Sequence, residues 1–265
     1  MHFNSRKIKH YIHKIASHTY FLPALVIALV ALATTTLLTI FLSTPRPAKL
    51  KLGSGDTLYT AGNKIFNASI GKKDGSQNIT FNVGDSSANF VLSGATPSTP
   101  KKSVNTVTFP SSLKNIDLKY TPTVNGLKEE IILHEKPANK TGNTFLFDLN
   151  FTNVAPSKLT NNFLSPTFKD SKGKYKFHFE KPFAFDASGS RTNNVLLQIM
   201  EDKQLPGKYS MKLIVDETWL NSPTRTYPIT IDPTIIHDTT AEFAAGTLNR
   251  LKDFGSGSAP MIETA

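Results

Sequence analysis

The chain has 265 residues, enough for one large domain or two small ones with cores of their own. It contains no cysteine, which excludes disulfide bonds and thiol chemistry. Its formal charge of +10 comes from 30 Lys and Arg against 20 acidic residues. Four of the cations lie in the first 14 residues, and no basic run with interleaved aromatic residues occurs elsewhere. Nucleic acid is therefore not an expected partner.

An apolar stretch near the N-terminus has the length of a membrane-spanning helix. It runs from Tyr20 to Leu42 without a charged residue. A helix of about 20 residues crosses the ~30 Å hydrocarbon core of a bilayer, whereas the apolar core of a cleaved signal peptide has ~7–15 residues. We predict a basic cytoplasmic tail (residues 1–19) and one retained transmembrane helix (residues 20–43), which binds the lipid bilayer. The remaining chain is then extracellular, because a short basic tail resists translocation.

The rest of the chain has the pattern of strands. Residues 44–54 carry two prolines and three cations and are expected to form an extended linker. Residues 55–233 repeat the period-two alternation of half-buried strands, and no amphipathic helix intervenes. The clearest runs lie at residues 78–83, 145–151, 175–179, 209–215 and 227–231. We predict an all-β ectodomain, an antiparallel β-sandwich with aromatic stripes in its core and a loop or subdomain seam at residues 93–103.

A tight hairpin is predicted at Asn125-Gly126, because this dipeptide favours a type I′ turn. Pairing outward from that turn places Tyr120 opposite Ile131 on an apolar face. The neighbouring carboxylates of Glu129 and Glu130 then point to opposite faces of the sheet. They are therefore not expected to act together on one substrate atom.

The search for reactive groups assigns no catalytic, cofactor-binding or metal-binding residue. Motifs of zinc proteases, nucleotide-binding loops and serine hydrolases are not present in the sequence. Two acidic pairs, Glu201-Asp202 and Asp216-Glu217, stand in turn-like surroundings and leave a weak calcium site open, although dedicated loops supply more oxygen ligands. His178 is expected to be solvated, because it alternates with Phe177 and Phe179 on the polar face of its strand.

Several short sequences between Leu113 and Thr234 resemble a β-rich module of large bacterial surface proteins. They are Asp117–Tyr120, Asn125–Glu129, Lys181–Ala184 with Asp186 and Gly189, Trp219-Leu220 and Tyr227–Thr234. In that family the module lies upstream of RHS repeats, DNRLRE-type domains or laminin-G-like (concanavalin-type) domains. Residues 234–265 resemble the start of a laminin-G-like domain. The resemblance implies that this tail is loosely ordered, that the chain is a fragment, and that no catalytic residue can be carried over.

Three classes of function remain open. The first is a non-enzymatic, membrane-anchored bacterial cell-surface protein whose sandwich is a stalk or scaffold for a downstream laminin-G-like binding domain. The second is an adhesion module in its own right, with a cell-surface glycan or protein as ligand. The third is a secreted hydrolase, which needs at least two ionisable groups in one pocket. We expect the first, and with it no cofactor.

Overall fold

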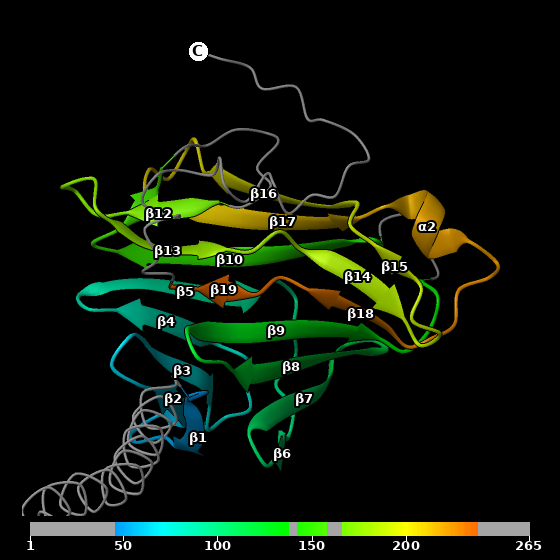
Figure 1. The fold of residues 1–265 in the computed structure, drawn as a ribbon, viewed down its shortest axis with the longest axis horizontal. Coiled ribbons are helices and arrows are strands. Elements are labelled where there is room, and N and C mark those ends of the chain that lie inside the picture. The colour runs from blue at the N-terminus through cyan, green and yellow to red at the C-terminus, as the bar shows by residue number, and fades with distance from the viewer. Residues whose placement is uncertain (1–45, 138–141, 158–165, 238–265) are drawn as a thin grey trace, which may run out of the picture. The chain divides into compact units, whose positions relative to one another are not determined.

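The computed structural model describes residues 46–137, 142–157 and 166–237, which form two antiparallel β-sheets and one short helix (Figure 1). The described residues from Pro47 onward belong to one compact unit. In this part of the chain no helix is long and apolar enough to cross a membrane. The predicted tail (residues 1–19), the predicted membrane span (residues 20–43) and the chain beyond residue 237 lie outside the described residues.

The first sheet has eight strands in the order β1-β2-β3-β4-β5-β10-β17-β16. Their bounds are β1 (Lys49–Leu52), β2 (Thr57–Gly62), β3 (Asn67–Lys72), β4 (Ile79–Val83), β5 (Ser86–Leu92), β10 (Thr144–Thr152), β16 (Val195–Glu201) and β17 (Tyr209–Val215). The first five strands follow one another in sequence and in space. The later strands β10, β17 and β16 then extend the sheet beyond β5.

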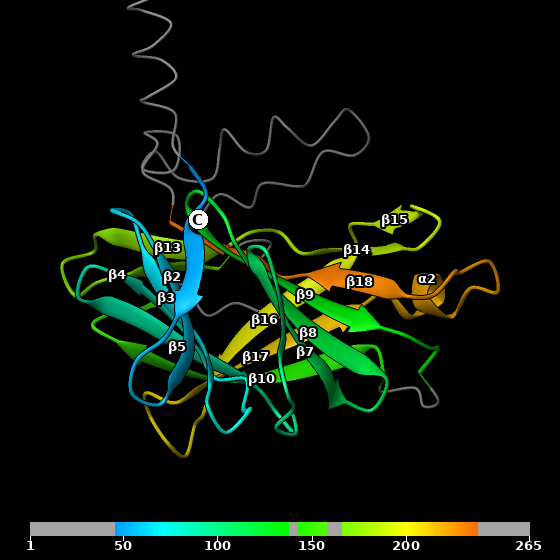
Figure 2. The same cartoon turned by 90° about the horizontal axis from the view of Figure 1, so that it is seen from below.

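The second sheet has eleven strands, with the order β11-β12-β13-β19-β9-β18-β14-β15 and with β8, β7 and β6 attached through β9. Their bounds are β6 (Lys101–Ser103), β7 (Thr106–Leu113), β8 (Ile116–Pro122), β9 (Gly126–Leu133), β11 (Ala155–Pro156), β12 (Thr167–Lys169), β13 (Tyr175–Phe179), β14 (Phe183–Asp186), β15 (Arg191–Thr192), β18 (Ile229–Asp232) and β19 (Ile235–Ile236). In Figure 1 the orange strands β19 and β18 follow one another between β9 and the strands β13 and β14. Figure 2 shows β7, β8 and β9 side by side.

One aromatic core joins the two sheets. The ring of Phe81 in β4 meets that of Phe177 in β13 edge-on, with centroids 5.7 Å apart. Across the same interior, Phe151 in β10 packs on Phe168 in β12 at 5.0 Å. In β4 and over residues 145–149 of β10 every second residue is buried, because successive side chains of a strand point to opposite faces. The antiparallel β-sandwich and the assignment of the aromatic stripes to its core are thus confirmed, in a described chain that is mostly β and has one short helix.

The sandwich is more extensive than the alternation predicted. β1 lies within residues 44–54, which were expected to form an extended linker. It belongs to the sandwich instead, since Leu50 is buried and the Ala48 amide donates to the Thr123 carbonyl at 2.9 Å. β19 lies beyond Pro233, where the strand pattern was expected to end, and both of its residues are buried. Residues 93–103 carry the chain from the first sheet to the second. A short helix, α2 (Glu217–Asn221), was not predicted.

The hairpin between β8 and β9 exists, but the predicted type I′ turn at Asn125-Gly126 is wrong. The two central residues are Val124 and Asn125, because the Thr123 amide donates to the Gly126 carbonyl at 2.9 Å, and neither has a positive φ. Gly126 instead begins β9 opposite β19, where an added Cβ would lie 2.2 Å from the Ile235 carbonyl oxygen. The glycine therefore permits a close strand approach rather than a turn.

The displaced turn shifts the β8–β9 pairing by two residues. Tyr120 lies opposite Glu129 and not opposite Ile131, and Leu118 takes the position facing Ile131. Because the side-chain period of a strand is two, this shift leaves every residue on the face that was predicted for it. Leu118, Tyr120 and Ile131 are accordingly all buried.

Candidate functional site

Glu129 is a carboxyl group on the core side of β9, and only 2% of its surface is exposed. Its Oε1 accepts a hydrogen bond from the Tyr120 hydroxyl at 2.7 Å, while no described residue donates to the buried Oε2. Burial raises the pKa of Glu129 to about 8, with a further contribution from the charge of Asp232 and against the effect of the Tyr120 hydrogen bond. Glu129 thus retains its proton at neutral pH.

The opposite face of the same strand carries an ion-pair network. The Glu130 carboxylate lies 2.7 Å from Lys119 Nζ and 3.1 Å from Lys128 Nζ, and Lys128 Nζ also lies 3.2 Å from Asp232 Oδ2. Burial alone would raise the pKa of Glu130, but the hydrogen bonds from the two lysines outweigh it and lower that pKa. Of these two adjacent carboxyl groups, Glu129 is therefore neutral and Glu130 is ionised at neutral pH.

This arrangement supports a structural role for both acids. As predicted, Glu129 and Glu130 point to opposite faces and do not converge. The burial of Glu129 was missed, although its position between Leu127 and Ile131 on the apolar face was a signal for it. Strand pairing is interrupted beside Glu129: β9 pairs with β19 through residues 126–127 and with β18 through residues 131–133, so residues 128–130 have no strand beside them on that edge.

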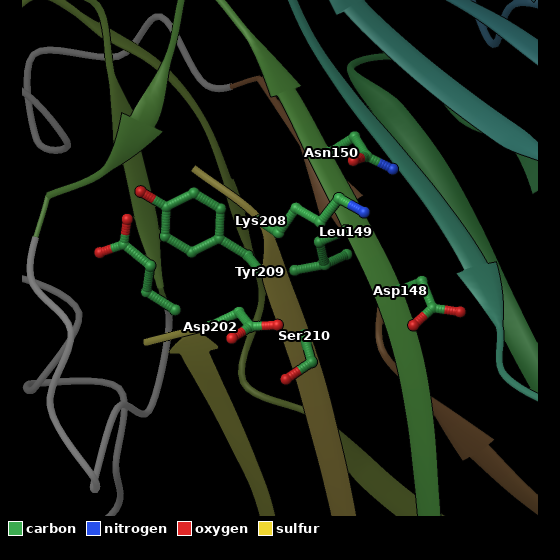
Figure 3. Close-up of a pocket in the computed structure, with 8 residues that line it drawn as sticks. Asp148, Leu149, Asn150, Asp202, Lys208, Tyr209 and Ser210 are labelled. Atoms are coloured by element: carbon green, nitrogen blue, oxygen red, sulfur yellow. The ribbon is translucent and has the colours of Figure 1, made fainter. Parts of the chain in front are cut away.

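A polar hollow of about 310 Å³ opens on the outer face of the first sheet, where β10 and β17 meet (Figure 3). It is lined by Asp148, Leu149, Asn150, Glu201, Asp202, Lys208, Tyr209 and Ser210. Asp148 and Asn150 project from the exposed side of β10, and Ser210 is the cross-strand partner of Asp148. The Tyr209 ring packs on Phe151 at 5.1 Å, so it forms part of the wall and not a free stacking platform.

The two acidic pairs left open as calcium sites shape turns and a helix end. Asp202 Oδ1 accepts from the amides of Gln204 and Leu205, at 2.8 and 3.3 Å. Asp216 caps α2 by accepting from the Trp219 amide at 3.0 Å, as expected of aspartate at a helix start. Among the residues with a described position, no three His, Asp or Glu side chains come together as a metal site.

The prediction of a solvated His178 is wrong, because its side chain is fully buried. β13 lies between β12 and β19, and three successive residues of it, Phe177, His178 and Phe179, are covered. The Tyr175 hydroxyl lies 2.7 Å from His178 Nδ1, and the Tyr175 ring stacks on the ring of His237. The histidine belongs to the core of the second sheet.

Comparison with known proteins finds one group of relatives. The chain is 33% identical over 138 residues to the tRNA nuclease WapA of Bacillus subtilis (strain 168), and 32% identical over the same length to the tRNA3(Ser)-specific nuclease WapA of Bacillus spizizenii. The matched region is 50% of this chain and 6% of each relative. No family model and no solved structure matches the chain. This chain thus shares a distant similarity with a small part of these long bacterial proteins.

Proposed function

We propose that this chain is a non-enzymatic, membrane-anchored bacterial cell-surface protein whose β-sandwich is a stalk or scaffold for a laminin-G-like binding domain that follows it. The observation that carries the proposal is the size of the match: the similar region makes up 6% of each WapA protein. A segment that recurs as a small part of a much longer chain is expected to belong to a building block. Its function then depends on the domains to which it is joined.

The structure of the sandwich suits a spacer. Phe81, Phe151 and their partners connect both sheets through one core, so the module resists deformation as a single unit. The uncharged stretch at residues 20–43 supplies the membrane anchor in this proposal. The resemblance of residues 234–265 to the start of a laminin-G-like domain supports the scaffold role.

The nuclease activity in the names of the relatives is not part of the proposal, because the match covers only a small fraction of those proteins. Two lysines of the second sheet, Lys119 and Lys128, are held by Glu130 and Asp232 and are poorly placed to neutralise phosphates. We therefore propose that the chain neither binds nor cleaves tRNA.

Membrane fractionation tests the proposal. The full chain, produced in a bacterial host, is expected to sediment with membranes and to resist alkaline carbonate extraction. A variant without residues 20–43 is expected in the soluble fraction, and the purified full chain is expected to leave tRNA intact. Recovery of the unaltered chain in the soluble fraction would contradict the anchor. Cleavage of tRNA would contradict the non-enzymatic role.

A second function, binding of a cell-surface glycan, is favoured by the hollow beside β10. Asp148 and Asn150 present carboxylate and amide oxygens there, together with the Lys208 ammonium group, and such polar groups hydrogen-bond sugars. Glycan-array binding by the detergent-solubilised full chain tests it. The Asp148→Ala, Asn150→Ala double variant should lose the signal, whereas Leu146→Ala on the same strand should keep it. An array without bound glycans, or equal binding by both variants, would exclude this function.

A further inference from the structure

Five strands lie at open edges of the two sheets in the described part of the chain, and four of them carry features that block pairing with another strand. The protective features are the lysines of β1 and β6, the proline and short length of β11 and the two-residue length of β15. β16 differs, because its seven residues include no lysine, arginine or proline. An unprotected edge of this length is a site at which a further strand can add.

The hydrogen bonds at the two ends of β16 show which backbone groups face outward. The Asp216 amide donates to the Asn194 carbonyl at 3.1 Å, and the Asp202 amide donates to the Lys208 carbonyl at 2.8 Å. In an antiparallel ladder, hydrogen-bonded residues alternate along the strand. The even-numbered residues of β16 therefore bond to β17, and the backbone groups of Leu197 and Ile199 point away from the sheet.

The side chains of this edge are mainly apolar. Leu197 and Ile199 are buried on the core face, while Leu196 and Gln198 are half-buried on the outer face. Met200, also on the outer face, has 41% of its surface exposed. An added strand would cover this apolar surface and bond the outward backbone groups.

We propose that β16 pairs with β16 of a second copy of this chain, antiparallel about a two-fold axis at Gln198, so that the first sheet continues across both copies. In this register Leu197 forms a hydrogen-bonded pair with the partner's Ile199, and Leu196 lies opposite the partner's Met200. Gln198 lies opposite itself, and because it is uncharged the two copies do not repel one another there. Glu201 faces Val195, so no like charges lie opposite one another. The strand is thus complementary to itself, as a two-fold interface requires.

Charge variants at the axis test this pairing in the full, detergent-solubilised chain. Gln198→Lys and Gln198→Glu each place two like charges opposite each other, and each alone should raise the dimer dissociation constant at least about tenfold. An equimolar mixture of the two should restore dimers, since the charges then attract. Leu146→Lys, on the outer face of β10 with 45% exposure, is the matched control and should dimerise as the unaltered chain does. Sedimentation velocity measures these four samples and the unaltered chain.

A cross-link provides a second readout that does not depend on charge. The native chain has no cysteine, so Leu196→Cys with Met200→Cys introduces the sole thiols. Their cross-strand position in the proposed register suits a disulfide, and mild oxidation should give a covalent dimer. Leu146→Cys should remain largely monomeric. An unaltered chain that stays monomeric up to about 100 μM, dimers insensitive to the Gln198 changes, or a control that cross-links equally well would overturn the proposal.

Discussion

The buried Glu129 carboxyl should make the stability of the sandwich fall as the pH rises. Its pKa is about 8 in the folded protein and 4.5 when it is solvated. Below pH 4.5 the group is protonated in both the folded and the unfolded state, so it contributes no pH dependence to the stability. Between the two values the folded protein holds a proton that the unfolded chain has released, so the free energy of unfolding falls by about 1.4 kcal/mol per pH unit. The full range corresponds to roughly 5 kcal/mol.

Glu129→Gln should remove this pH dependence. The amide oxygen of Gln can accept the Tyr120 hydrogen bond, and the side chain stays neutral at every pH. Its NH₂ group replaces the buried Oε2 and loses hydrogen bonds to water, at a cost of about 1–3 kcal/mol. The variant should therefore be no more stable than the native protein near pH 5 and more stable by several kcal/mol near pH 8.

Urea unfolding at a series of pH values measures the effect, with Glu130→Gln as the adjacent control. The folded pKa of Glu130 is lowered, so the stability from its ion pairs is present above its unfolded pKa and disappears as the pH falls through the folded value. Its replacement should destabilise the protein at neutral pH and matter less in acid. If the native protein keeps the same stability between pH 5 and 8, or if Glu129→Gln leaves its slope unchanged, the assignment of a buried neutral carboxyl is refuted.

Four further substitutions test the packing of the second sheet in the same unfolding assay. Ile131→Ala should cost about 2–5 kcal/mol, and Ile132→Thr on the opposite face less than about 1, whereas the reverse ranking would show that the faces are exchanged. Gly126→Ala should cost more than about 1 kcal/mol, since its methyl group would collide with β19; an unchanged unfolding midpoint would contradict that close approach. Asp186→Ala should cost about 3–5 kcal/mol, because it leaves Arg225 without its buried partner 3.0 Å away, and a loss below about 1 kcal/mol would show that this pair is not needed.

The elements that the sequence predicted well are those in which local alternation and burial agree. The run from residue 78 to 83 became β4. The run from residue 145 to 151 became part of β10, in which Phe145, Phe147 and Leu149 are buried. The faces of β8 and β9 were also correct, because apolar residues specify the face of a strand even where the turn is misplaced.

The errors arose where distant parts of the chain decide the local structure. Gly126 was interpreted through its neighbour Asn125, but its small size is required by β19, more than 100 residues later in the sequence. His178 was placed on a solvated face, since the sequence of its own strand does not reveal that the strand is enclosed. Lys49–Leu52 resembled a linker because of its cations, although Leu50 is buried against the sandwich. Tertiary pairing overrides local pattern in each case.

Thiol labelling of intact cells tests the proposed membrane topology most directly. Because the chain has no cysteine, Ser5→Cys in the basic tail and Val104→Cys, at a site with 96% exposure, can be labelled one at a time. With the full chain in a bacterial host, a membrane-impermeant maleimide should label Val104→Cys on intact cells and Ser5→Cys only after permeabilisation. If Val104→Cys is labelled only after the cells are opened, the sandwich is not outside the membrane, and the cell-surface function proposed for it is wrong.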